Sequence, residues 1–446
     1  MTEAAEHHGR AAAIRHGLRP AVTAFCDSAR GFAIAMTPFI VAVFIATYLG
    51  MAIGRVPGLR IDRTGIALLA LAALLGAGAL GLGEVGRAID APTLLLLFAL
   101  MLVSAQFATS GFYDLCARAI TRASRHPSTL LGVTILVGGA LSAVLANDIV
   151  VFAMTPLLCA GLKARGADPR PYLLGLAGAA NAGSAATVIG NPQNILIGQV
   201  GRLDFGAFLI ACGAPALIAL LLVHLCVLWR WRRELGTRDV AAAPAEPPVA
   251  TERGQIAKGL IATLVLIGLF VAPVPRELAA LAVAAVLLIS RRTASREMLA
   301  RVDWQLLLLF TCLFAVTAAF SQTGLARDGL AWLGARGALP DNLAVLTPLA
   351  LIASNTIGNV PAVVLLLSIW PNPPEGALYG LALLSTLAGN FLLVGSLANI
   401  IVAERAQVSG VRLGFADFAR AGMPMTLAGV AVAVLWLGLL GYLPWH

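Results

Sequence analysis

The chain has 446 residues, of which 59% are hydrophobic and only 12% are charged. Soluble proteins carry about 25% charged residues, so this composition excludes an ordinary soluble globular protein and indicates a polytopic membrane protein. The net charge of +9 does not indicate a nucleic-acid partner, because the basic residues lie in short loops between apolar stretches, as the positive-inside rule explains.

The apolar stretches fall into two sets, preceded by an N-terminal tail at 1–31 and separated by a charged, Pro- and Ala-rich linker at 230–255. The first set predicts spans at 32–54, 64–83, 92–111, 171–200 and 204–229. The second set predicts spans at 256–273, 277–290, 303–323, 377–403 and 421–443. Each set also contains one unusual segment, at 128–162 and at 343–370.

The two sets are related as repeats, one at 32–229 and the other at 256–443. Leu94–Phe98 matches Leu306–Phe310, and Ser142-x4-Asn147 matches Ser354-x4-Asn359, both with a shift of 212 residues. Each set has five spans plus one unusual segment. An odd number of crossings places the second repeat upside down relative to the first, so we predict two inverted repeats in an all-α membrane protein.

The segment 128–162 is too long for one crossing, because a continuous helix of this length would run about 50 Å through a core of about 30 Å. Basic residues precede and follow it, which places both of its ends on the cytoplasmic side. We therefore predict a re-entrant hairpin with its tip at Ala146-Asn147-Asp148, and a matching hairpin at 343–370. Two short tilted crossings are the alternative.

The distribution of Lys and Arg favours both termini outside, since this orientation places most of the 31 basic residues inside. The four Arg residues of the N-terminal tail argue against its export. We expect a location in the bacterial inner membrane.

Two of the predicted spans contain more amide, hydroxyl, Gly and Pro than a lipid-facing helix tolerates, and Gly190-x-x-x-Asn194 matches Gly395-x-x-x-Asn399. Broken, polar segments at corresponding places in two repeats indicate a transporter binding site. The alternative role is hydrogen bonding between helices without a solute. Together with the two hairpin tips, the candidate solute-binding residues are Asn147, Asn181, Ser184, Thr187, Gly190, Asn191, Gln193, Asn194, Asn359, Asn390, Gly395, Ser396 and Asn399.

Asp148 is the only carboxylate between Cys116 and Gly166. A buried carboxylate in a membrane is costly, and burial favours its neutral form, so it could take up and release a proton near neutral pH. We predict that Asp148 is the proton-coupling residue. Its alternative role is to cap the second helix of the hairpin. The matching position is Val360, so the second hairpin has no such carboxylate.

These motifs together resemble the ion transporter superfamily, which includes arsenite efflux permeases, sodium/proton antiporters, citrate transporters and divalent-anion/sodium symporters. The stretch from Asn147-Asp148 through Gly190-Asn191-Pro192-Gln193-Asn194 is similar to the plant silicon efflux transporters and their bacterial relatives. The resemblance covers about residues 32–443. It implies a scaffold, a mobile transport part that moves like an elevator, and a possible homodimer.

The chain departs from the sodium symporters of that superfamily, which carry Ser-Asn-Thr at both tips. Here the tips read Ala146-Asn147-Asp148 and Gly358-Asn359-Val360, so both hydroxyls are missing. The literal Ser354-Asn355-Thr356 does not align with Asn147 at the shift of 212 residues. We therefore expect a proton rather than sodium as the coupling ion.

The sequence contains no motif for catalysis, and we expect neither an enzyme, a metal site nor a cofactor. We predict a secondary transporter for proton-coupled efflux of a small oxyanion or neutral metalloid hydroxide, such as arsenite or silicic acid. The alternatives are a sodium-coupled carboxylate or sulfate symporter, a sodium/proton antiporter, and a polytopic membrane enzyme. The expected partners are a small inorganic solute, a proton or sodium ion, and the lipid bilayer.

Overall fold

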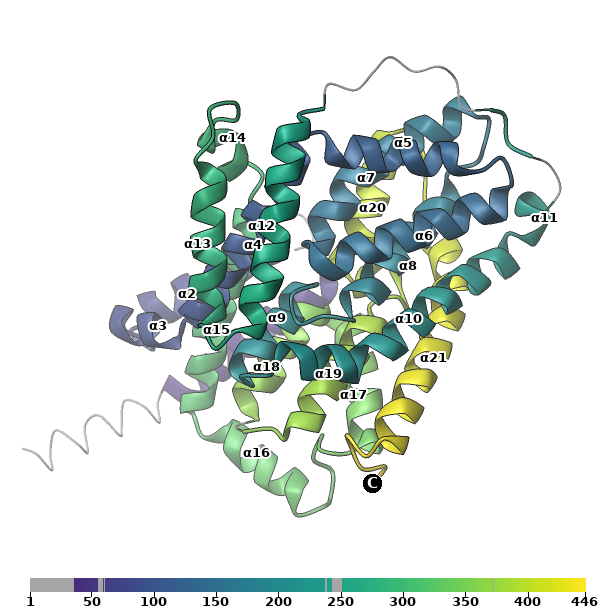
Figure 1. Ribbon diagram of the computed structural model, residues 1–446. Coiled ribbons are helices and arrows are strands. Elements are labelled where there is room, and N and C mark those ends of the chain that lie inside the picture. Colours follow the sequence, from purple (N-terminus) through teal and green to yellow (C-terminus); the bar gives the residue numbers. More distant parts are fainter. Residues whose placement is uncertain (1–35, 55–58, 60, 237–238, 243–250, 371) are drawn as a thin grey trace, which may run out of the picture.

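The computed structural model describes residues 36–54, 59, 61–236, 239–242, 251–370 and 372–446, and all its regular elements there are helices (Figure 1). Eight of these helices are long and apolar enough to cross a membrane. The prediction of an all-α polytopic membrane protein is therefore confirmed. The predicted tail at 1–31 lies outside the described residues, as does part of the linker at 230–255.

The helices of the first half begin with Met36–Ile53. They continue with α2 (Arg63–Gly76), α3 (Leu82–Ala88), α4 (Ala91–Thr109), α5 (Phe112–Ala123), α6 (Pro127–Val144), α7 (Asn147–Ala164), α8 (Arg170–Ser184), α9 (Pro192–Val200), α10 (Phe205–Arg230) and the short α11 (Arg232–Leu235). The second half comprises α12 (Arg253–Val271), α13 (Arg276–Leu288), α14 (Ser295–Leu299), α15 (Trp304–Gln322), α16 (Leu325–Gly334), α17 (Leu343–Thr356), α18 (Asn359–Ile369), α19 (Glu375–Ala388), the 3-10 turn η1 (Leu393–Gly395), α20 (Leu397–Val408) and α21 (Phe415–Leu439).

The order of elements repeats from α4–α10 to α15–α21. The equivalent helices α4 and α15 both begin after an Asp, Asp90 and Asp303, whose carboxylate accepts a hydrogen bond from the backbone N–H three residues on. The equivalent helices α5 and α16 lie at opposite ends of the molecule in Figure 1. Inverted repeats require this placement, and their inversion across a membrane stays a prediction.

Two groups of helices make up the fold. The scaffold group comprises Met36–Ile53, α2, α4, α12, α13 and α15, in which α13 packs on α4 and α2 packs on α15. The hairpin group comprises α6–α10 and α17–α21, in which α6 packs on α8, α17 on α19, and α10 on α21. The two halves exchange partners in both groups, since α7 also packs on α20 and α18 on α9.

The sequence analysis missed the short helices α5 and α16. In α5, Tyr113, Ala117, Ile120 and Thr121 are buried on one face. The spacing of Tyr113, Ala117 and Ile120 is the helical periodicity that could have predicted α5. The Arg residues of α5 also fit a charged loop between spans, so the sequence favours a loop as strongly as a helix here.

Both unusual segments are divided into two helices. The break in 128–162 falls at Leu145 and Ala146, between α6 and α7, and the break in 343–370 falls at Ile357 and Gly358, between α17 and α18. Gly358 adopts a left-handed φ of 94°, which only glycine adopts without strain. Because α6 and α7 each have 18 residues, the choice between a re-entrant hairpin and two tilted crossings stays open.

Arg165 fastens part of the linker to the base of this first hairpin. Its guanidinium is 3% exposed and donates to the carbonyl oxygens of Ala241 (2.7 Å), Ser124 (2.8 Å) and Thr121. The backbone N–H of Val240 donates to the carbonyl of Arg125 over 2.9 Å. The connection between the two halves is thus held by a buried cation that reaches three carbonyl groups at once.

We expect Arg165→Lys to lower the thermal midpoint of the detergent-solubilised protein, because one ammonium cannot reach three divergent carbonyl groups. Each hydrogen bond to a charged group contributes about 1.5–3 kcal/mol. Arg296→Lys, at an exposed position of α14, is the matched control and should leave the midpoint unchanged. Equal midpoints for both variants would contradict this role of Arg165.

Candidate functional site

The two broken helices, α8–α9 and α19–α20, bring most of the predicted site residues together in the interior. Nine polar members of the predicted set lie there, each 6% exposed or less: Asn181, Ser184, Thr187, Asn191, Gln193, Asn194, Asn390, Ser396 and Asn399. Buried polar groups need hydrogen-bond partners. The partners of these residues therefore show what they do in this structure.

Each break is held by an Asn at the start of its second helix. Asn194 Nδ2 donates to the carbonyl oxygens of Ser184 and Thr187 over 3.2 and 3.1 Å. Asn399 Nδ2 donates to those of Gly389 and Leu392 over 2.7 and 3.3 Å. In both cases the acceptors lie ten and seven residues earlier in the chain. One side chain thus donates to two carbonyl groups at each break, of which those of Thr187 and Leu392 also accept a backbone N–H.

The glycines of the two matching motifs allow this close packing. A Cβ at Gly190 would lie 2.4 Å from the carbonyl oxygen of Ser184. A Cβ at Gly395 would lie 2.5 Å from Asn355 Oδ1. Neither position has space for a side chain, so these two predicted site residues act through the backbone.

The two breaks are joined to each other by equivalent hydrogen bonds. Asn181 Nδ2 donates to Asn399 Oδ1 over 3.1 Å, and Thr386 Oγ1 donates to Asn194 Oδ1 over 3.2 Å. Adding 205 to 181 and 194 gives 386 and 399, so the second bond repeats the first. We call Asn181, Asn191, Asn194, Thr386, Asn390, Ser396 and Asn399 the amide network.

Further bonds complete the amide network. Ser396 Oγ donates to Asn181 Oδ1 over 2.9 Å, and at the equivalent place Asn191 Nδ2 donates to Thr386 Oγ1 over 3.3 Å. Asn181 Nδ2 also donates to Asn390 Oδ1 over 2.8 Å. These groups are used in joining the helices, which supports the interhelical role. Solute binding by these residues stays a prediction. Gln193 Oε1 is available for it, because this buried acceptor has no hydrogen-bond partner among the described residues.

The hairpin tips lie beside the breaks. At the first tip, Thr187 Oγ1 donates to the carbonyl of Ala143 over 2.5 Å. At the second, Asn355 Nδ2 donates to the carbonyl of Ala388 over 2.9 Å. Asn355 belongs to α17 rather than to the tip, which agrees with the alignment of Asn359 with Asn147. Each tip is thus tied to the break of its own repeat.

The two tip asparagines have groups without partners. Asn147 is 4% exposed and its Oδ1 has no hydrogen-bond partner. Asn359 is 6% exposed, and its Oδ1 accepts from the N–H of Val360 over 3.0 Å. These amides are therefore better placed than the amide network to contact a solute.

Asp148 lies in the first turn of α7 and is half-buried. The cap position of α7 is Ala146, whose side chain caps nothing, and Asp148 makes no hydrogen bond or ion pair within the described part of the chain. Its expected alternative role as a hydrogen-bonding cap is therefore not seen. The side chain lines a cavity of about 380 Å³ instead of packed core.

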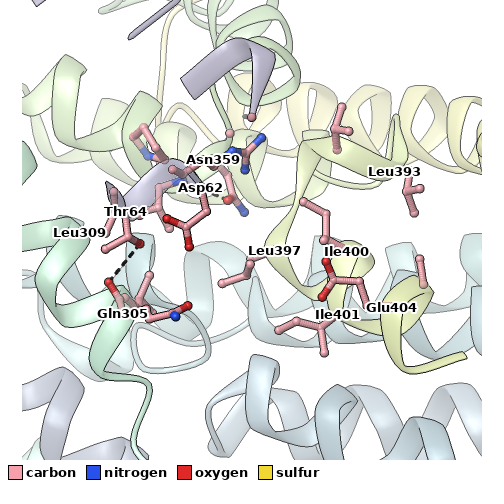
Figure 2. A pocket seen from close by; sticks show the side chains of 18 of the residues that line it. Asp62, Thr64, Gln305, Leu309, Asn359, Leu393, Leu397, Ile400, Ile401 and Glu404 are labelled. Carbon is pink, nitrogen blue, oxygen red and sulfur yellow. Dashed lines mark hydrogen bonds between the residues drawn. The ribbon is translucent and has the colours of Figure 1, made fainter. Parts of the chain in front are cut away.

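A larger cavity of about 770 Å³ lies beside the second tip and is shown in Figure 2. Asn359, Asp62, Thr64 and Gln305 lie on one side of it, and Glu404 with Ile400 and Ile401 lies on the other. Asp303 and Ile401 line both this cavity and the smaller one at Asp148. The two cavities are therefore neighbours at the boundary between the scaffold group and the hairpin group.

The sequence analysis missed the charged residues that line these cavities besides Asp148, namely Asp62, Arg63, Arg301, Asp303, Glu404 and Arg412. Asp62 and Asp303 precede apolar helices and cap them, which is a pattern readable from sequence. The sequence does not predict that Asp62 and Asp303 lie near the second tip, because α2 and α15 approach this tip only in the folded chain.

We expect Asn399→Ala to destabilise the protein, because it removes the hydrogen bonds to the carbonyl groups of Gly389 and Leu392 and the one from the Asn181 amide. Each buried group left unsatisfied costs about 1–3 kcal/mol. Asn194→Ala, its counterpart in the other repeat, should lower the thermal midpoint by a similar amount. Gln407→Ala, at an exposed position of α20, is the control. A midpoint unchanged by Asn399→Ala would contradict the bracing role of the amide network.

Comparisons with known proteins agree with this architecture. The family profile described as "CitMHS: Citrate transporter" matches residues 39–377. An uncharacterized transporter of Mycobacterium tuberculosis is 28% identical over 430 residues, covering 91% of this chain and 99% of the relative. The silicon efflux transporter LSI3 of Oryza sativa is 27% identical, covering 86% of this chain and 94% of the relative.

A solved structure has the same fold. The YdaH transporter of Alcanivorax borkumensis, described as having an unusual topology, is similar with a TM-score of 0.55 and 17% identity, covering 92% of this chain and 99% of its own. The matching family and these relatives are transporters and not enzymes. This chain belongs to the CitMHS citrate transporter family and is an integral membrane secondary transporter.

Proposed function

We propose that this transporter couples proton movement to the efflux of a small oxyanion or neutral metalloid hydroxide of the arsenite or silicic acid type. The observation that carries the proposal is Asp148, a carboxylate without a partner among the described residues, on the wall of a cavity next to the larger one at the second tip. The similarity to a silicon efflux transporter supports the substrate class.

The surroundings of Asp148 suit a group that alternates between neutral and charged forms. The cavity wall around it is mainly apolar, with Leu97, Leu100 and Phe152 among its residues, and the charged side chains that line it besides Asp148 are Arg301 and Asp303. In such surroundings the charged carboxylate is costly unless a cation accompanies it. A proton is the smallest such partner, and its release would follow when the cavity opens to water.

The position of the cavities supports an elevator-like movement. The larger cavity is lined by α2 and α15 of the scaffold group and by α18 and α20 of the hairpin group. A solute held at the second tip would travel with the hairpin group as it slides past the scaffold. By the charge rule for orientation, this cavity faces the cytoplasm, which is the side from which an exporter loads.

A second candidate function is transport of a carboxylate anion. Arg63 lines the larger cavity and lies against Gly358 at the second tip. The tip segment 343–370 contains no Lys or Arg of its own. The family description also names citrate. Sodium coupling of such transport is disfavoured, because neither tip carries the Ser and Thr of the sodium symporters.

A homodimer, a bacterial inner-membrane location and outward-facing termini remain proposals from the sequence. Many large apolar side chains on the outer surface, such as Leu217 on α10 and Leu264 on α12, are exposed within the chain. Contact with lipid accounts for them without a second copy.

We expect Asp148→Asn to lower the rate of transport driven by a pH gradient in proteoliposomes at least about tenfold, because an amide cannot carry the proton. Solute exchange without a gradient should continue in this variant, since exchange requires no net proton movement. Asp148→Glu should retain part of the coupling.

The matched control is Asp328→Asn, at an exposed position of α16, which should transport like the natural chain. Arsenite, silicic acid and citrate are compared as substrates, each with and without sodium. Unchanged proton coupling in Asp148→Asn would remove this residue from the mechanism. Sodium-dependent citrate uptake without proton movement would replace the proposed function by the second candidate.

A further inference from the structure

We infer that the second hairpin tip is an anion site, in which Arg63 from the scaffold group and Asn359 from the hairpin group together recognise a singly charged oxyanion. The inference rests on the proposed function in one respect, that the 770 Å³ cavity receives the transported solute. The inference assigns one negative charge to that solute. It also identifies Arg63, which lies outside the hairpin tips and the broken helices, as a residue that determines specificity.

The first observation is the position of the Arg63 guanidinium. A Cβ built on Gly358 would lie 3.3 Å from Arg63 Nη1 and 3.8 Å from its Cζ. On the other side, Arg63 Nε lies 3.9 Å from the equivalent point on Gly54. Arg63 makes no hydrogen bond or ion pair with any described residue. Among the described residues, its five N–H donors at the second tip therefore have no acceptor.

The second observation is the start of α18, an eleven-residue helix. Its cap position is Gly358, which provides no side-chain cap, and its first turn contains no acidic residue. The N-terminus of a helix carries a partial positive charge, which favours an anion. This charge acts here without a row of free N–H groups, because the N–H of Val360 donates to Asn359 Oδ1, Pro361 has no N–H, and the N–H of Ala362 donates to the carbonyl of Gly358. A guanidinium beside this end adds charge of the same sign, and α18 itself contains no carboxylate to oppose it.

The third observation is the Asn359 amide. The residue is 6% exposed and lines the cavity (Figure 2). Its Oδ1 is occupied by the N–H of Val360, whereas its Nδ2 makes no hydrogen bond with a described residue. An amide nitrogen that borders a cavity and has no acceptor among the described residues can donate to a bound ligand. An oxyanion would accept from Asn359 and Arg63 at the same time.

The first tip provides the contrast. There α7 carries Asp148 in its first turn, so this helix end has its own negative charge. The equivalent position in α18 is Val360. The first tip thus contains a carboxylate, whereas the second tip contains hydrogen-bond donors and no carboxylate. The two repeats share the same order of helices, but the first tip is suited to a cation and the second tip to an anion.

The remaining charges of the cavity limit the ligand to one negative charge. Asp62, Asp303 and Glu404 line it together with Arg412. Asp62 and Asp303 each accept a backbone hydrogen bond at a helix start, and Glu404 is exposed. Three carboxylates against two guanidinium groups repel a multiply charged anion such as citrate. They leave room for a monovalent oxyanion whose charge is held at the tip.

The test measures binding of small solutes to the purified full-length protein by the shift of its thermal midpoint. The probes are acetate and nitrate as monovalent anions, citrate as a multivalent anion, and silicic acid as a neutral hydroxide, all at constant ionic strength. We expect stabilisation by a monovalent anion. We expect Arg63→Gln to raise its apparent dissociation constant at least about tenfold, through loss of charge-assisted hydrogen bonds. Arg63→Lys should restore part of the affinity.

Two further variants keep the test decisive if Arg63→Gln folds poorly. Val360→Asp places a carboxylate at the position equivalent to Asp148, where it should compete for the donors of the site and remove anion binding. Because Val360 is 6% exposed, the thermal midpoint of the free variant is measured first to verify that it folds. Arg327→Gln, at an exposed position of α16, is the charge control and should bind like the natural chain. Monovalent anion binding that survives both Arg63→Gln and Val360→Asp would overturn the inference.

The failure of this inference and that of the proposed function can be told apart. Loss of anion binding in Arg63→Gln, in a protein that exports no metalloid solute, supports the anion site and rejects the proposed substrate class. Export of silicic acid or arsenite that is unchanged in Arg63→Gln, with no stabilisation by any anion, supports the proposed function and rejects the anion site. Stabilisation by citrate greater than that by acetate or nitrate overturns the limit to one charge.

Discussion

A helix that breaks inside an apolar bundle leaves N–H and C=O groups that must find partners, because unsatisfied groups are very costly where water is scarce. The amide network meets this requirement at both breaks. Asn194 and Asn399 each donate to two carbonyl groups at the break that precedes them. Through Asn181 and Thr386 each break also supports the other. The position of both hairpin tips depends on this arrangement, since the tips are tied to the breaks.

The equivalence of the two repeats is closer in the amide network than in the residues that face the cavities. Both Asn–carbonyl pairs span the same number of residues, and the bonds between the breaks occur in equivalent pairs. At the tips, however, Asp148 corresponds to Val360. Bracing requires the same geometry in each repeat, whereas coupling two different species requires two different sites. This division explains why a nearly symmetric frame carries asymmetric chemistry.

The cavities lie where the two groups of helices meet, and this location gives the scaffold group a chemical role. Arg63 and Asp303 belong to α2 and α15, yet they line cavities whose other walls are hairpin tips and the second broken helix. Asp303 borders both cavities while it caps α15. A movement of the hairpin group past the scaffold would change the distance from these charges to the tips. The energy of a bound solute or proton would then depend on the position of the hairpin group.

The sequence by itself determined the membrane class, the helical architecture, the two sets of equivalent segments and the polar positions of the broken helices. These features depend on local composition and on spacing along the chain, as in the match of Gly190 and Asn194 with Gly395 and Asn399. Only the tertiary structure decided that Asn181 meets Asn399, that Asp148 faces a cavity without capping α7, and that Arg63 stands at Gly358. These pairings join residues hundreds of positions apart, or helices from different repeats. No local pattern specifies them, because they follow from how the helices pack.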